Sequence, residues 1–146
     1  MTEVKLTKTD RKLLRRIRDM VAATHWGKGE YFRQGRAADE YYGPDKDTYC
    51  LVGFVNKVTG LSVEEGDIYL GSDATTLSHY DSVRDEYVES KMPRSRVRLI
   101  AALKAAIAVK APRARSIEEF NDRRSTTRKD ILEVLDLTLG DKGDRS

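Results

Sequence analysis

Residues that could support catalysis or bind a metal are few in this chain, and they are not grouped. The 146 residues include two histidines, His25 and His79, and one cysteine, Cys50, whereas a closed zinc site takes four sulfur or nitrogen ligands at short paired spacings. No Gly-x-Ser-x-Gly segment marks a hydrolase nucleophile, and the Gly-Lys-Gly at 27–29 lacks the spacing of a phosphate-binding loop. The sequence therefore predicts no catalytic residue, no metal ligand and no cofactor, and it leaves an enzyme as a disfavoured alternative.

A dense set of basic side chains is a stronger candidate for function. Segment 91–129 carries twelve basic and three acidic residues, whereas segment 25–90 carries six basic and thirteen acidic ones. Charge blocks of this kind either fold against each other or present separate faces to different partners. If the basic residues converge in space, they would attract phosphates or an acidic protein. The candidate contacts in the basic segment are Arg94, Arg96, Arg98, Arg113, Arg115, Arg123 and Arg124.

Aromatic side chains supply a second group of candidate contacts. Trp26, Tyr41 and Tyr42 lie in segment 25–47, where glycines interrupt any helical periodicity. Aromatic and arginine side chains dominate the binding energy of protein interfaces. The sequence therefore predicts that these three aromatics, with the arginines, contact a partner.

Asn121 and Asp122 are the remaining candidate site residues. They are expected just before a helix, where such side chains either bond turn amides or take part in a functional site. If the protein is an enzyme, its active-site pocket is expected between the Trp26 loop and this turn. Cys50 is expected to be a core residue rather than a reactive thiol, and Gly53 is expected to let another backbone approach closely.

Four stretches with apolar residues at helical spacing must position these side chains. The predicted helices cover residues 7–24, 49–58, 93–110 and 127–139. The third is nearly all apolar, which predicts that it is the central helix. Almost no polar face is left between Leu99, Ile100, Leu103, Ala106, Ile107 and Ala108.

Local signals mark where several of these helices begin and end. Thr7 with Asp10, and Thr127 with the acid three residues later, have the spacing of capping boxes. Gly60 and Gly140 stand where a helix is expected to end. Because these signals involve only residues close together in the sequence, they predict the ends of the helices without knowledge of the tertiary structure.

Three further segments are ambiguous. A short helix is an option at 36–41, and 67–71 reads as a short strand or an extended segment. Residues 82–90 are read as a helix with Val83 and Tyr87 facing inward. The resulting fold class is a mainly all-α, compact bundle of four to six helices, with one short strand pair left open. Residues 1–140 form the predicted domain, and 141–146 form a polar tail.

Three short motifs resemble an uncharacterised family of small proteins from actinobacteria and their phages. They are Trp26 followed by glycines, Cys-Leu-Val-Gly at 50–53, and Phe-Asn-Asp at 120–122 followed by Thr126 and Thr127. Two positions differ from the family pattern, with phenylalanine at 54 in place of alanine and at 120 in place of the usual tryptophan. The resemblance implies a common fold and an actinobacterial or phage setting, and it transfers no mechanism.

These observations predict a small, phage-encoded binding protein that docks on a host or phage macromolecule. The expected partner is a protein. A nucleic-acid-binding accessory protein that uses segment 94–129 is the alternative. The apolar run 99–109 contains Lys104 and is about half the length of a membrane span, so no membrane partner is expected. One cysteine and no leader-like start predict a cytoplasmic location.

Overall fold

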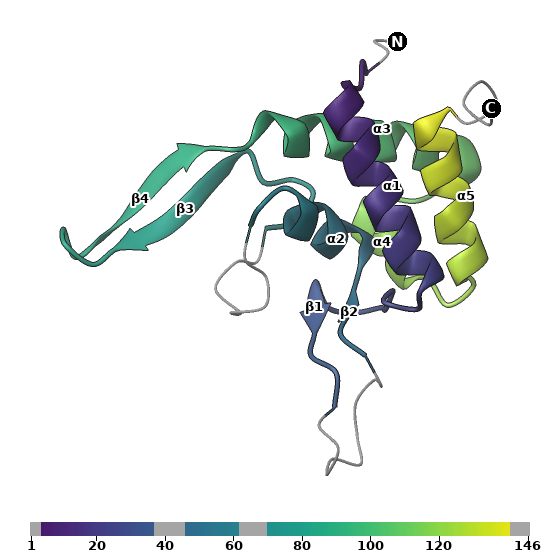
Figure 1. Cartoon of the computed structure of the whole chain (residues 1–146), viewed down its shortest axis with the longest axis horizontal. Coiled ribbons are helices and arrows are strands. Elements are labelled where there is room, and N and C mark those ends of the chain that lie inside the picture. Colours follow the sequence, from purple (N-terminus) through teal and green to yellow (C-terminus); the bar gives the residue numbers. More distant parts are fainter. Residues whose placement is uncertain (1–3, 37–45, 62–69, 141–146) are drawn as a thin grey trace.

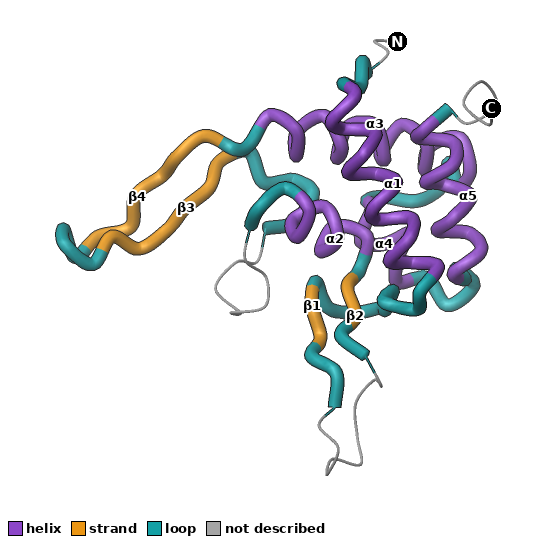
Figure 2. Tube along the Cα trace, in the orientation of Figure 1, coloured by secondary structure: helices purple, strands orange, loops and turns teal. Residues whose placement is uncertain are grey.

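The computed structural model describes residues 4–36, 46–61 and 70–140. In these residues five helices form a body, and a β-hairpin projects from it (Figures 1 and 2). The elements in chain order are α1 (Lys8–Ala22), β1 (Phe32–Arg33), β2 (Thr48–Tyr49), α2 (Leu51–Val58), β3 (Thr76–Asp81), β4 (Glu86–Lys91), α3 (Arg94–Lys110), α4 (Ile117–Asp122) and α5 (Arg128–Leu139). The fold is therefore mainly helical, as predicted, but the described residues contain two strand pairs rather than one.

Helix α3 is the centre of the body, as its apolar sequence predicts. It packs against α1, α2, α4 and α5. Leu99, Leu103 and Ile107 on its inner side are buried in the hydrophobic core. Ala108 is exposed, and Val109 beside it is 72% exposed. The outer side of α3 therefore carries apolar residues beside the exposed Arg94 and Lys104.

The predicted capping boxes of α1 and α5 are both confirmed. Thr7 Oγ1 accepts from the Asp10 amide, and the Asp10 carboxylate accepts from the Thr7 amide. Thr127 and Asp130 repeat the pattern at α5, which ends at Gly140 with a left-handed φ of 65°. Such reciprocal bonds satisfy amides that a helix start leaves without partners.

Helix α2 begins two residues after the end of strand β2. Cys50 is its N-cap residue, is buried, and accepts a hydrogen bond from the Gly53 amide at 3.4 Å. A Cβ atom at position 53 would lie 1.8 Å from the carbonyl oxygen of Tyr31. Only glycine lets the two backbones approach so closely, which confirms the predicted role of Gly53 and explains how residue 31 is held against α2.

Segment 82–90 is not a helix. Strands β3 and β4 pair antiparallel from Thr76 opposite Lys91 to Asp81 opposite Glu86. The Asp81 carboxylate accepts from the amides of Val83 and Arg84, which favours a turn at this point. The helix prediction was wrong because it required Val83 and Tyr87 to be buried, and both side chains are exposed.

One helix was missed by the sequence analysis, and three predicted segments cannot be compared with the structure. Helix α4 was not predicted, because its six residues are too few for an apolar periodicity to show. The options at 36–41 and 67–71, and the tail at 141–146, lie wholly or almost wholly outside the described residues.

Candidate functional site

The three sequence motifs meet in space at one side chain, Asn121. Its Oδ1 atom accepts hydrogen bonds from Trp26 Nε1 at 2.7 Å and from the Leu51 amide at 3.0 Å. Its Nδ2 group donates to the Gly27 carbonyl at 3.1 Å and to the Asp122 carboxylate at 3.0 Å. Asn121 thus joins α4, the start of α2 and the Trp26 loop.

The position of Asn121 corrects its expected role. It lies near the end of α4 rather than just before α5, and it is fully buried. Both of its polar atoms are bonded within the protein. Asn121 therefore fastens the fold together, and the enzyme pocket predicted between it and Trp26 would have no polar atom of Asn121 to offer a substrate.

Neighbouring bonds extend this cluster toward the surface. The Asp122 carboxylate accepts from the Gly29 amide at 2.8 Å, and Lys28 Nζ donates to the Arg123 carbonyl at 2.6 Å. Lys28 Nζ also lies 5.7 Å from the centre of the Trp26 ring, within the range of a cation–π contact. Trp26 is half-buried against the core, so much of its ring is already covered within the chain.

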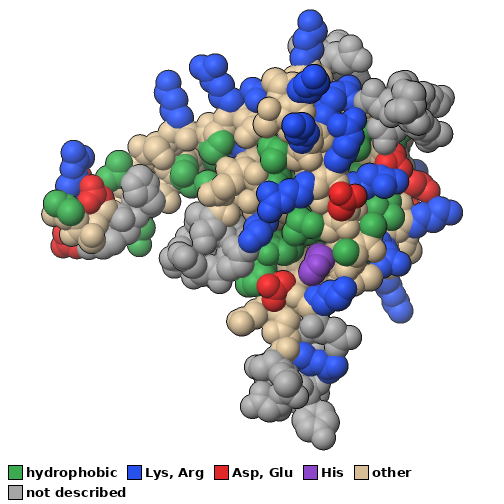
Figure 3. Space-filling model, in the orientation of Figure 1, with side chains coloured by type: hydrophobic (Ala, Val, Ile, Leu, Met, Phe, Trp, Pro, Cys, Tyr) green, Lys and Arg blue, Asp and Glu red, His purple; other side chains and the backbone are tan. Residues whose placement is uncertain are grey.

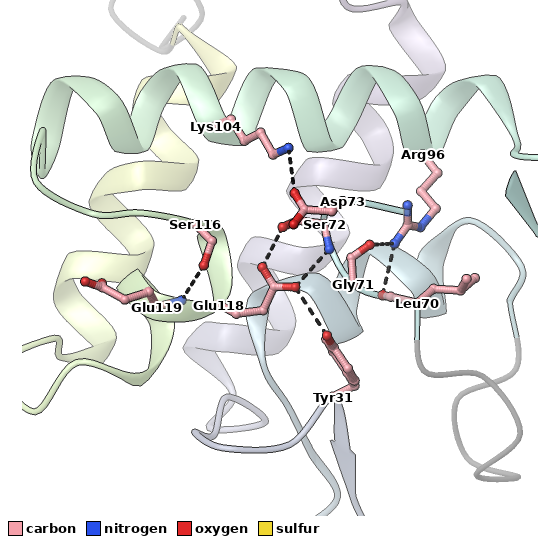
Figure 4. A network of polar contacts seen from close by, with 10 residues as sticks. All are labelled: Tyr31, Leu70, Gly71, Ser72, Asp73, Arg96, Lys104, Ser116, Glu118 and Glu119. Atoms are coloured by element: carbon pink, nitrogen blue, oxygen red, sulfur yellow. Dashed lines mark hydrogen bonds and ion pairs between the residues drawn. The ribbon is translucent and has the colours of Figure 1, made fainter. Parts of the chain in front are cut away.

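A second polar network surrounds Glu118 on α4 (Figure 4). Its carboxylate accepts from the Ser72 amide at 2.8 Å, from Ser72 Oγ at 2.6 Å and from the Tyr31 hydroxyl at 3.2 Å. Burial acts to raise the pKa of Glu118, but the hydrogen bonds from Ser72 and Tyr31 outweigh it and hold that pKa below its usual value. Burial, together with the Glu118 charge, raises the pKa of Tyr31 to about 12. The network keeps Glu118 ionised and ties segment 70–75 to α4.

Arg96 belongs to the interior rather than to a binding surface. Only 1% of the residue is exposed. Its Nε atom donates to Asn56 Oδ1 at 2.7 Å, and Nη2 donates to the carbonyls of Leu70 and Gly71 at 3.1 and 2.9 Å (Figure 4). The guanidinium therefore holds segment 70–71 against α3, and Arg96 leaves the set of surface contacts predicted from the sequence.

The other predicted basic contacts divide into two groups. Arg98 pairs with the buried Asp10 at 2.6 Å, and Arg123 pairs with Glu119 at 2.6 Å. The remaining four are exposed and form no ion pair within the part of the chain that the structure describes. These are Arg94, Arg113, Arg115 and Arg124. Tyr41 and Tyr42 lie outside the described residues.

Two hollows lie side by side along α3, and we call them together the α3 groove. Their volumes are about 390 and 230 Å³. Both are lined by Asp73 and Lys104, whose charged groups are 3.7 Å apart in an exposed ion pair (Figure 4). The larger hollow could not be predicted from the sequence, because its second wall, residues 72–75, is separated from α3 by the whole of hairpin β3–β4.

The comparisons with known proteins give one match. The model of a family described as "Family of unknown function (DUF6197)" matches residues 5–139. The chain belongs to the DUF6197 family. This confirms the expectation of an uncharacterised family, while an actinobacterial or phage origin stays a prediction. Neither the search of curated proteins nor that of solved structures gives a match.

Hairpin β3–β4 of this DUF6197 chain, residues 76–91, carries exposed side chains, and we call it the arm. It extends away from the helical body (Figure 1). Val83 at its turn is 93% exposed and Tyr87 on β4 is 77% exposed. The arm has four acidic residues and two basic ones. The arm was not predicted, because the helix expected at 82–90 covers its turn and its second strand.

The described residues of this DUF6197 protein contain neither a metal-binding cluster nor a membrane-spanning helix. No group of three or more histidine, cysteine or acidic side chains there could hold a metal ion. No helix in the described ranges is long and apolar enough to cross a membrane. The features that remain as candidates for function are the arm, the α3 groove and the exposed arginines.

Proposed function

We propose that this DUF6197 protein is a small binding protein that docks on a partner protein through the arm. The observation that carries the proposal is the projection of a hairpin with exposed apolar side chains from an otherwise well-packed body (Figure 1). The partner is a host or phage macromolecule in the cytoplasm of a bacterial cell.

The energetics of the arm support a role in docking. A two-stranded hairpin is at best marginally stable by itself in water, and the principal contacts of β3 and β4 are with each other. Val83 and Tyr87 leave apolar area in water that neither strand covers. Association with another protein would remove that area from water and stabilise the hairpin at the same time.

The charge of the arm favours a protein partner over a nucleic acid. Asp81, Asp85, Glu86 and Glu89 outnumber Arg84 and Lys91. Phosphate groups would be repelled by this surface, since nucleic-acid contacts depend on neutralisation by lysine and arginine. A protein surface with basic and apolar side chains is the complementary partner.

The test is a comparison of two valine substitutions. The tagged full-length chain, its Val83→Ser variant and its Val109→Ser variant are incubated with lysate of the cells that encode it, and the captured proteins are identified by mass spectrometry. Val109 is 72% exposed on α3, so it is a matched control outside the arm. We expect Val83→Ser to lose at least one partner that Val109→Ser retains. Equal capture by all three forms would remove the arm from the proposal.

A second candidate function is nucleic-acid binding by the exposed basic residues beyond α3. The residues that favour it are Arg113, Arg115, Arg124, Arg128 and Lys129, all exposed in or next to the two loops that flank α4. Affinity for a labelled duplex or single strand should then fall steeply with salt, because phosphate contacts release counterions. The Arg113→Gln/Arg115→Gln double variant should reduce the salt slope by about two. Absence of binding at about 50 mM salt would eliminate this candidate.

A further inference from the structure

We infer that the arm of one copy of this chain docks in the α3 groove of a second copy, and that the two copies do so reciprocally. The inference rests on the proposed docking role of the arm and names its partner. It is drawn from the match between the arm and the groove in chemistry, charge and length.

The α3 groove offers apolar surface with positive charge above it. Val97, Ile100 and Ala101 line the larger hollow, and Ile107 and Ala108 line the smaller one. Lys104 lies between the hollows, and the exposed Arg115 borders the smaller one. An occupant of this groove should therefore combine apolar side chains with carboxylates.

The arm has the composition that this groove requires. Tyr87 and Glu89 lie two positions apart on β4, so both side chains point to the same face of the hairpin. Val83 is at the turn, and Glu86 begins β4. One face of the arm thus presents an aromatic ring beside a carboxylate, with a further apolar side chain at its end.

The ion pair within the groove can be replaced by the arm. Lys104 and Asp73 are separated by 3.7 Å, and their side chains are 46% and 95% exposed. An exposed pair of this kind contributes little to stability. A carboxylate of the arm that is placed against Lys104, with its apolar neighbours buried, would take over the position of Asp73 at little cost.

The geometry permits two such contacts at once. Each six-residue strand of the arm spans about 20 Å, and the 17-residue helix α3 spans about 25 Å. The arm continues outward from the N-terminal end of α3 (Figure 1). A two-fold axis near that junction would lay each arm along the α3 helix of the other copy, which gives a closed dimer rather than a chain of molecules.

The first test is the mass of the full-length protein in solution. Sedimentation velocity and light scattering are recorded at low salt from about 1 μM to about 1 mM protein. We expect a concentration-dependent shift to twice the 16.6 kDa mass of the chain, and a weaker shift when salt shortens the range of charge interactions. A mass that stays at one chain over the whole range would overturn the inference.

Charge reversal on each side then tests where the copies meet. The arm variant is Glu86→Lys/Glu89→Lys, and the groove variant is Lys104→Glu/Arg115→Glu. Each alone should weaken dimerisation by roughly tenfold or more. An equimolar mixture should recover the dimer, because the reversed arm of one variant faces the reversed groove of the other and the unreversed pair remains. Circular dichroism and thermal unfolding confirm that each variant is folded.

The outcomes separate this inference from the proposed function. A dimer that survives either reversal, or variants whose mixture stays monomeric, would show that the arm and the groove do not meet. If the chain is monomeric but capture of a partner still depends on Val83, the proposed function holds and the second copy is not the partner. If the reversals and their mixture behave as expected, the docking role of the arm holds and its partner is a second copy of the chain.

Discussion

At the scale of single residues, Asn121 has the largest structural role of the predicted site residues. Its Oδ1 atom is the acceptor for two donors, the Trp26 indole and the Leu51 amide. Removal of a buried acceptor leaves its donors without partners, at a cost of about 1–3 kcal/mol for each group. We expect Asn121→Ala to lower the free energy of unfolding by about 3 kcal/mol.

Urea unfolding followed by tryptophan fluorescence measures this loss directly, because Trp26 is the single tryptophan of the chain. Arg124→Ala is the matched control, since Arg124 is exposed three residues away. It should change the unfolding free energy by less than about 0.5 kcal/mol. Equal stability of the two variants would show that the hydrogen bonds of Asn121 are replaced by water at no cost.

The lowered pKa of Glu118 predicts how the stability of the protein depends on pH. Its pKa in the folded protein is below its usual value of 4.5, because hydrogen bonds from Ser72 to the carboxylate outweigh the effect of burial. A lowered pKa means that the stabilisation is complete above about pH 4.5 and is lost as the pH falls through the lower, folded value. We therefore expect the wild type to lose more stability between pH 6 and pH 3 than Glu118→Gln does.

Thermal unfolding across that range provides the measurement. Glu30→Gln, a change to an exposed glutamate, is the control and should follow the wild-type curve. Asp10 and Asp130 also have lowered pKa values, for Asp10 through hydrogen bonds to Arg98 and Thr7 that outweigh burial, and for Asp130 mainly through bonds to Thr127. Some acid sensitivity will therefore remain in Glu118→Gln, but parallel curves for it and the wild type would contradict the role given to Glu118.

The residue scale also shows what could be predicted from the sequence. The capping boxes were predicted correctly because both partners lie within four residues of each other. The role of Asn121 could not be predicted, because its donors Trp26 and Leu51 lie 95 and 70 positions away. Arg96 was misread as a surface residue for the same reason, since its acceptors come from segments far from it in the sequence.

At the scale of elements, the contact between α2 and residue 31 depends on the absence of a side chain at Gly53. A methyl group there would lie 1.8 Å from the Tyr31 carbonyl oxygen, and so the two backbones would have to separate. We expect Gly53→Ala to destabilise the protein by roughly 3 kcal/mol.

A second glycine substitution separates this clash from backbone strain. Gly29 has a φ of +87°, and nothing lies within 4 Å of the position that an added methyl group would take, so Gly29→Ala should cost only about 1–2 kcal/mol. Chemical denaturation of both variants gives the comparison. A smaller loss for Gly53→Ala than for Gly29→Ala would show that α2 moves away from residue 31 easily.

The arm should be dispensable for the folding of the helices. Its strands make their main contacts with each other, whereas the core is made by α1 to α5. We expect replacement of residues 77–90 by a short Gly-Ser link to leave the helical circular dichroism of the body intact and the melting temperature within a few degrees of the wild type. Loss of cooperative unfolding would mean that the arm supports the body.

The arm was also the element that the sequence predicted least well. Helix α3 was predicted correctly because its apolar residues recur along 17 positions. Segment 82–90 has too few apolar residues to define a period, and it carries Val83 and Tyr87 at a spacing that suits one face of a helix. Their exposure in the hairpin depends on the turn at Asp81, a local signal that was not recognised.

At the scale of the whole molecule, the charges of the helical body and those of the arm are arranged differently. Within the body, basic residues pair with acids of other helices, as Arg98 does with Asp10 and Arg18 with Asp136. The acidic arm is instead held away from the body, and basic side chains gather on the face over α1 (Figure 3). The sequence could show that the blocks exist, but the choice between pairing and separation depends on tertiary positions.

The single thiol of the chain gives a way to follow opening of the whole molecule. Cys50 is buried beneath the first turn of α2, and burial raises its pKa to about 12. A thiol reacts as its thiolate, so a maleimide or disulfide reagent at neutral pH should modify only molecules whose α2 has detached. The rate of labelling would then report how often the native body opens, without any substitution or added probe.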